Sequence, residues 1–210
     1  MKTRIQFYVA LASCMLAVNA ATANDKYTET MQANIEKVYN AGSIEELQPV
    51  VNNFERIAVA EKTKWEPYYY ASFGYTMMAN REKDGSKKDG YLDQALNAVA
   101  KAKELAPTES EVIAMEGFVH MLRVTVDPAA RGQQYSGMAM QAFGKAVSLN
   151  PENPRALAML AQMQYGMAQF FGNSTADACA TATQALVKFD SFASENVLAR
   201  AGERAWPSRS

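Results

Sequence analysis

The chain has 210 residues, with 21 basic and 22 acidic side chains and a formal net charge of −1. This length suits a single domain with one buried core. The near balance of charge gives no electrostatic footprint for nucleic acid or for an anionic membrane surface, so we expect neither as a partner.

Residues 1–23 are predicted to be a signal peptide. Lys2 and Arg4 supply a positive start, and residues 7–18 are almost continuously apolar. A run of about a dozen apolar residues fits a signal sequence but is too short to span a membrane, and no later run is long enough. Small residues before Ala20 and Ala23 suit signal peptidase, so we expect a periplasmic or secreted mature protein.

Cys14 leaves one alternative open. Leu11-Ala12-Ser13-Cys14 resembles the lipobox of bacterial lipoproteins, whose cysteine carries the lipid anchor. The chain stays apolar after Cys14, which favours ordinary cleavage over an envelope lipoprotein. Cys179 would then be the one mature cysteine, with no partner for an intramolecular disulfide, and we expect it to be a small buried hydrophobe.

Residues 24–42 are predicted to form an N-terminal cap helix. Apolar side chains recur at helical spacing from Met31 to Tyr39, and Ala41-Gly42 ends the pattern. Ser43-x-x-Glu46 is a capping box that opens the next helix, in which Pro49 predicts a kink.

The following segment repeats one internal spacing, Ala-x3-apolar-x2-Ala-x4-Pro. Because these positions are three and four residues apart, each copy places its small and apolar side chains on one face of a helix that proline ends. The copies are Ala95, Val99, Ala102 and Pro107; then Ala139, Phe143, Ala146 and Pro151; then Ala178, Ala182, Ala185 and Asp190, with a degenerate copy at Val50, Phe54, Ile57 and Lys62.

Each such helix is followed by another with an apolar face, such as Ile113-x3-Gly117 and Leu157-x2-Leu160-Ala161. Over residues 43–190 the chain resembles the tetratricopeptide repeat (TPR) family, whose second helices carry this spacing of alanine, aromatic and proline. In the stretches 54–57, 65–70 and 150–155 it is also similar to uncharacterised secreted TPR-like proteins of Gram-negative bacteria. The resemblance implies an all-α fold, a right-handed superhelical stack of helical hairpins (an α-solenoid) with helical caps.

The repeats are longer than those of the family. Ala95, Ala139 and Ala178 are 44 and 39 residues apart, against about 34 in the family. We expect the extra residues to form elongated loops inside the hairpins, at residues 80–90, 123–137 and 171–174. Residues 191–210 are predicted to be a C-terminal cap helix and tail, with Val197, Leu198 and Ala201 facing inward.

The TPR resemblance also implies a concave groove lined by the first helix of each hairpin. By residue spacing, this groove would be aromatic and methionine-rich, without the basic set that grips a peptide carboxylate in chaperone-binding members. The alternative is that these side chains are core. The predicted partner-binding residues are Tyr69, Phe73, Met77, Met115, Phe118, Met121, Met159, Gln162 and Tyr165.

The sequence offers little that is typical of a catalytic or metal site. His120 is the single histidine and falls at a packing position, and no paired histidines, cysteine cluster or nucleophile elbow occurs. We therefore expect no catalytic residue, no metal and no cofactor. An enzyme or small-molecule site would have to combine His120 with Tyr68 to Tyr70 and Arg131.

These observations favour an exported module that binds a protein or peptide through an apolar groove. A structural subunit of an envelope assembly is the first alternative, since a groove filled by another chain would have the same composition. A small-molecule-binding protein is the second. The oligomeric state and the partner are not encoded in any recognisable motif.

Overall fold

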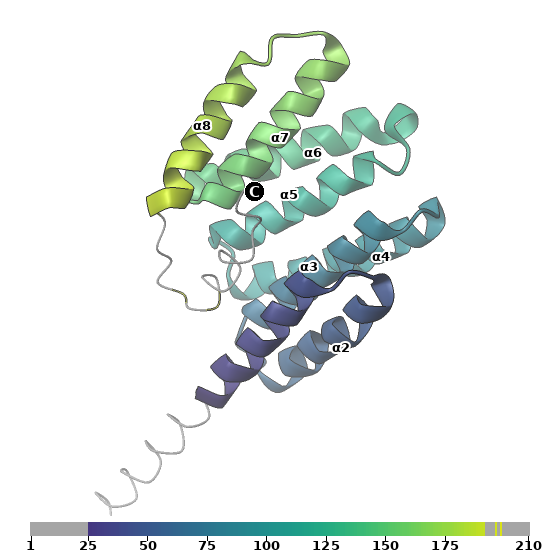
Figure 1. Ribbon diagram of the computed structural model, residues 1–210, viewed down its shortest axis with the longest axis vertical. Coiled ribbons are helices and arrows are strands. Elements are labelled where there is room, and N and C mark those ends of the chain that lie inside the picture. The colour runs from purple at the N-terminus through teal and green to yellow at the C-terminus, as the bar shows by residue number, and fades with distance from the viewer. Residues whose placement is uncertain (1–24, 192–195, 197, 199–210) are drawn as a thin grey trace, which may run out of the picture.

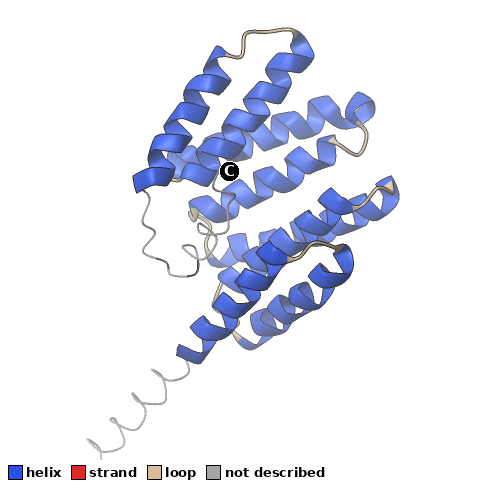
Figure 2. Ribbon diagram, viewed as in Figure 1, coloured by secondary structure: helices blue, strands red, loops and turns tan. Residues whose placement is uncertain are grey.

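The computed structural model describes residues 25–191 together with Asn196 and Leu198. Throughout this part of the chain every regular element is a helix (Figure 2). A first helix covers residues 25–40. It is followed by α2 (Ile44–Ala60), α3 (Glu66–Arg81), α4 (Gly85–Leu105), α5 (Ser110–Val124), α6 (Pro128–Leu149), α7 (Pro154–Phe171) and α8 (Ala176–Ser191).

Consecutive helices pair into hairpins that stack in chain order, from the purple and blue first pair to the green and yellow α7 and α8 (Figure 1). Helix 25–40 pairs with α2, and Asn53 of α2 donates a hydrogen bond to Asn34 at 3.1 Å. Met31, Leu47 and Phe54 belong to one buried cluster that continues through α3, α4 and α5. The predicted cap helix is thus the first helix of a complete hairpin.

The repeated spacing marks the buried face of each second helix, as predicted. Ala95, Ala102, Ala139 and Ala146 are all fully buried. Phe143 fills the space between α6 and α5, where a Cβ on Gly117 would lie 2.6 Å from its ring. Small residues therefore set how closely the helices approach, and one large side chain fills the gap that remains.

Two of the three inserted segments do not form the predicted loops. The residues at 80–90 and 123–137 extend the second helices instead, so that α4 has 21 residues and α6 has 22, and only short turns join those hairpin partners. Residues 172–175 do lie outside the helices, between α7 and α8. Asp84 and Asp127 start α4 and α6, since each side chain accepts a backbone N–H three residues on. Asp89 accepts hydrogen bonds from Arg123 and Arg131, which ties the added turns of α4 to α5 and α6.

The other helix boundaries follow local signals. Ser43 caps α2 by accepting from Glu46 N at 3.2 Å, as the capping box predicts. Pro49 lies inside α2, whose helical assignment is continuous from Ile44 to Ala60. Asn153 caps α7, and Gly172 ends it in the left-handed region with a φ of 68°, a conformation that glycine adopts without a steric penalty.

Leu198 returns from the end of the chain to the second hairpin. It is buried in the main cluster, and its carbonyl accepts a hydrogen bond from the Tyr70 hydroxyl at 2.7 Å. Asn196 donates to Glu66 at 3.1 Å. The inward orientation predicted for Leu198 is confirmed; Val197, Ala201, the signal peptide and Cys14 lie outside the described residues.

Cys179 was predicted to be buried, and this prediction is wrong because the side chain is exposed. Ala178 and Ala185 face the hairpin partner α7, and Cys179 lies about 100° further round α8. No further hairpin covers that side of α8 in the described chain. Of the helices described, none is long and apolar enough to cross a membrane.

Candidate functional site: a hollow on the first-helix face

The first helices of the hairpins surround a small hollow with an open volume of about 20 Å³. Successive first helices bring equivalent positions side by side, and helix 25–40 adds one aromatic ring from its end. The residues around this concave hollow are Tyr39, Tyr69, Phe73, Glu111, Ala114, Met115, Phe118, Arg155 and Met159. This volume has room for about one water molecule, so the lining side chains largely fill the space between the first helices.

The structure brings together only part of the predicted groove. The members that line the concave hollow are Tyr69, Phe73, Met115, Phe118 and Met159. Of these only Phe118 is half-buried; the others are buried, as the core interpretation expected. Met77 and Met121 are half-buried outside the lining, and Gln162 and Tyr165 are exposed. Their role in binding a partner stays a prediction.

Tyr39 closes one end of the groove, which sequence reasoning did not predict. Its ring lies 4.9 Å from that of Phe73. Tyr69 contacts Trp65 and Tyr70 edge to face, with ring centroids 5.8 Å and 5.0 Å apart. Because such contacts favour fixed ring orientations, this end of the groove is a rigid aromatic wall.

A buried ion pair between Glu111 and Arg155 lies in the lining of the concave hollow. Arg155 Nε donates to Glu111 Oε2 at 2.9 Å, and Nη2 lies 2.9 Å from Oε1. The two side chains are 7% and 8% exposed. Tyr69 also donates to Oε2, at 3.3 Å. The carboxylate therefore joins α3, α5 and α7 through polar contacts inside an apolar face.

The pair shapes the protonation of its neighbours. Burial lowers the pKa of Arg155, but the Glu111 carboxylate more than offsets this and leaves the pKa above its ordinary value. Burial raises the pKa of Tyr69, and Glu111 raises it further. Burial likewise raises the pKa of Tyr39 to about 12. At neutral pH the concave hollow thus holds one cation, one anion and two uncharged phenols.

Arg155 is a basic group in the lining that the predicted set of groove residues did not include. Its Nη1 is buried and has no hydrogen-bond partner among the described residues. A sequence signal existed: Glu111 and Arg155 occupy the first turns of successive first helices, 44 residues apart. That separation equals one repeat period, so opposite charges at these positions predict a contact.

A second hollow, with an open volume of about 10 Å³, adjoins the same ion pair. It is bounded by Trp65, Glu66, Tyr69, Tyr70, Glu111 and Arg155. Tyr70 and Glu66 are the residues that hold Leu198 and Asn196. Asn196 and Leu198 therefore lie against the aromatic wall, close to the ion pair.

The residues considered for an enzyme site are in different environments. His120 stacks on Tyr135 with centroids 6.1 Å apart, and Arg123 lies 5.7 Å above the same ring. Burial lowers the pKa of His120. Arg131 pairs with Asp89 near the start of α6, whereas Tyr69 belongs to the concave hollow. His120 is therefore not part of the hollow that contains the tyrosines.

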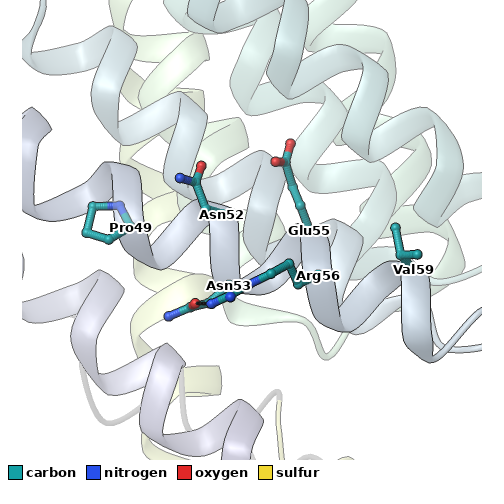
Figure 3. A pocket seen from close by; sticks show the side chains of 6 residues that line it. All are labelled: Pro49, Asn52, Asn53, Glu55, Arg56 and Val59. Atoms are coloured by element: carbon teal, nitrogen blue, oxygen red, sulfur yellow. Dashed lines mark hydrogen bonds between the residues drawn. The ribbon is translucent and has the colours of Figure 1, made fainter.

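Another depression lies along α2 and is open to solvent (Figure 3). Its side chains come from one helix, and the polar ones have local partners. Arg56 donates to Asn53, and Glu55 accepts from Tyr75 at 2.7 Å. The part of the chain that the structure describes also holds no cluster of three or more His, Cys, Asp or Glu side chains placed for a metal ion.

Comparisons with known proteins bear on the fold. The structure is similar to the HusA haemophore from Porphyromonas gingivalis, with a TM-score of 0.73 and 25% sequence identity over 85% of this chain and 89% of that chain. It is also similar to TTC0263, a thermophilic TPR protein in Thermus thermophilus, with a TM-score of 0.51 and 18% identity over 76% and 72% of the two chains.

The second likeness is one of fold alone. No protein-family model matches the sequence, and no curated protein matches it. The two neighbours, together with the stacked hairpins, confirm the predicted TPR-like α-solenoid.

Proposed function

We propose that this chain is an exported carrier that binds haem, or a closely related tetrapyrrole, on the face formed by its first helices. The observation that carries this proposal is the similarity to the HusA haemophore, which extends over 85% of this chain and 89% of that one. Haem would be the cargo of the protein. The signal sequence predicted at residues 1–23 is consistent with such a role outside the cytoplasm.

The chemistry of the side chains around the concave hollow supports the proposal, and these side chains would have to move apart to admit a ring, since the open volume is about 20 Å³. A tetrapyrrole is a flat apolar ring with carboxylates on one edge, so it requires aromatic or aliphatic surface and a polar group for that edge. Phe73, Phe118 and Met159 supply apolar surface, and Met115 supplies a flexible thioether that adapts to a bound ring. Arg155 supplies the polar group.

Titration with haem tests this proposal. Haem added to residues 24–210 should produce a saturable shift of the haem Soret absorption band. Phe118→Ala should weaken the binding, because Phe118 is the half-buried side chain of the hollow. Phe170→Ala is the matched control, since Phe170 is 77% exposed and lies outside the hollow. An unchanged haem spectrum, or equal weakening by both variants, would contradict the proposal.

Protein or peptide binding is the second candidate, and a separate surface favours it. Tyr165, Phe170 and Phe171 of α7 are 51%, 77% and 61% exposed, and exposed aromatic side chains are typical of interaction surfaces. In this case Phe170→Ser should abolish capture of a partner from the native envelope, whereas Phe118→Ala should not. Light scattering on the purified chain would identify self-association, as expected of an assembly subunit.

A further inference from the structure

Two residues near the end of the chain are held against the first turns of α3. Leu198 is 4% exposed and belongs to the main buried cluster. Its carbonyl accepts a hydrogen bond from the Tyr70 hydroxyl at 2.7 Å, although 128 positions separate the two residues in the sequence. The Asn196 side chain donates to Glu66 at 3.1 Å and accepts the backbone N–H of Leu198 at 2.9 Å. We call these bonds, together with the buried Leu198 side chain, the C-terminal contact.

The C-terminal contact acts on the aromatic wall. The ring of Tyr70 stacks on Phe54, with centroids 5.5 Å apart, and meets Tyr69 edge to face at 5.0 Å. Tyr69 lines both the concave hollow and the second hollow beside the ion pair. Because Tyr70 is bonded to Leu198 and packed on Tyr69, the C-terminal contact restrains a side chain that the two hollows share.

The concave hollow is closed in this arrangement. Its open volume of about 20 Å³ has room for about one water molecule, so a tetrapyrrole enters only if the lining side chains move apart. Movement at the Tyr69 end of the lining disturbs Tyr70, and with it the buried position of Leu198. The C-terminal contact therefore stabilises the closed arrangement of the first-helix face relative to an open one.

We propose that the C-terminal contact holds the first-helix face closed and that a tetrapyrrole releases this contact when it enters. This inference rests on the proposed haem-carrier function and adds regulation of the same site by the end of the chain. A ligand that requires the open arrangement has an apparent affinity reduced by the small population of that arrangement. Weakening the C-terminal contact therefore raises the affinity, whereas the loss of a merely structural contact would leave the affinity unchanged or lower it.

Removal of one hydroxyl group tests this closing role. Tyr70→Phe keeps the buried ring but removes the hydrogen-bond donor to Leu198. Haem titration of residues 24–210 should give a Kd lower than that of the wild-type protein by roughly two- to tenfold, as expected for one neutral hydrogen bond. Tyr75→Phe is the matched control, because this hydroxyl also belongs to a buried tyrosine of α3 and donates to Glu55 at 2.7 Å, outside both hollows. The control variant should leave the Kd unchanged.

A second pair of variants changes the apolar part of the C-terminal contact. Leu198→Ala should lower the Kd for haem further than Tyr70→Phe does, because it removes most of a buried side chain. Leu186→Ala, at a position of α8 that is 44% exposed, should not lower it. Circular dichroism checks that each variant is helical, and if Leu198→Ala does not fold, the comparison of Tyr70→Phe with its control still decides.

Amide hydrogen exchange measures the closing role without any ligand. In Leu198→Ala the amides of α3 around Tyr69 and Tyr70 should exchange faster than in the wild-type protein, because the open arrangement is populated more often. Leu186→Ala should not change the exchange of α3.

The outcomes separate the closing role from the haem-carrier function. Unchanged or weaker haem binding by folded Tyr70→Phe, with haem binding by the wild-type protein intact, would overturn the closing role and leave the carrier function standing. Unchanged exchange of α3 in folded Leu198→Ala would overturn the closing role too. Failure of the wild-type protein and of both variants to bind haem would instead overturn the haem-carrier function, and the exchange of α3 would then decide the closing role by itself.

Discussion

Replacement of Gly117 by alanine tests the close packing of α5 on α6. A Cβ at this position would lie 2.6 Å and 2.7 Å from two ring atoms of Phe143. Carbon atoms in contact are normally about 3.5–4.0 Å apart, so the ring would have to move by roughly 1 Å. Phe143 is completely buried, and its neighbours restrict any such movement.

The expected loss of stability in Gly117→Ala can be estimated by comparison with a change at a second glycine. Overpacking of a buried site costs about 1–3 kcal/mol, whereas alanine in place of glycine inside a helix contributes up to about 1 kcal/mol of stability. Gly144→Ala, on α6, is the matched control, because a Cβ there would meet no atom within 4 Å. Both variants replace a helical glycine with alanine, so the gain in helix propensity is the same and cancels from the difference in stability. Gly117→Ala should therefore be less stable than Gly144→Ala by about 1–3 kcal/mol.

Urea unfolding followed by circular dichroism, which reports the loss of helix, measures this difference. The slope of the unfolding free energy with urea should stay unchanged, because the surface exposed on unfolding is the same. Adding Phe143→Leu to Gly117→Ala should cost less than Phe143→Leu alone, since the smaller side chain relieves the clash. Equal stability of the two glycine variants would refute the close contact between α5 and α6.

Three further predictions concern buried polar groups and the C-terminal segment. Glu111→Gln should lower the free energy of unfolding by roughly 3–5 kcal/mol because it leaves a buried guanidinium unpaired, whereas Glu116→Gln should cost at most about 1 kcal/mol; equal losses in urea unfolding would refute the burial of the first pair. Burial lowers the pKa of His120, so the unfolded chain takes up this proton at a higher pH than the folded one, and stability should fall as the pH drops below about 6.5. His120→Gln should remove that component, and parallel pH profiles of the two proteins would contradict the assignment. Leu198→Ala should cost roughly 2–5 kcal/mol if the buried side chain packs as part of the core, and an unchanged unfolding midpoint would show that the contact near Tyr70 contributes nothing.

Much of the fold follows from the sequence because the repeat acts through local physics. Ala139, Phe143 and Ala146 lie on one face of a helix whatever the rest of the chain does, and Pro151 ends that helix after Leu149. The place of the additional residues at 80–90 and 123–137 was predicted wrongly. Residues 85–90 are glycine, serine and charged residues, a composition typical of a turn. In the structure Asp84 is the N-cap of a helix that includes them, and Asp89 pairs with Arg123. That pairing is a tertiary contact that local propensity does not contain.

The candidate site shows the same division between local and tertiary information. Tyr69, Phe73 and Phe118 were predicted from helical register, and they line the concave hollow. The core alternative predicted their burial, whereas the open-groove interpretation did not, because the ring of Tyr39 packs on Phe73 from a helix that had been interpreted as a cap. Arg155 was missed because its partner Glu111 is one repeat away in the sequence. The search followed the periodic apolar positions and did not include single charged residues.

The central claim is that the face formed by the first helices binds a tetrapyrrole. Amide hydrogen exchange of residues 24–210, measured with and without haem, tests it most directly, because ligand contacts slow the local opening that permits exchange. Haem binding should slow exchange in α3, α5 and α7 around Phe73, Met115 and Met159, with little change in α4 and α6. Slower exchange confined to the exposed end of α7 around Phe170, or no change in any helix, would contradict it.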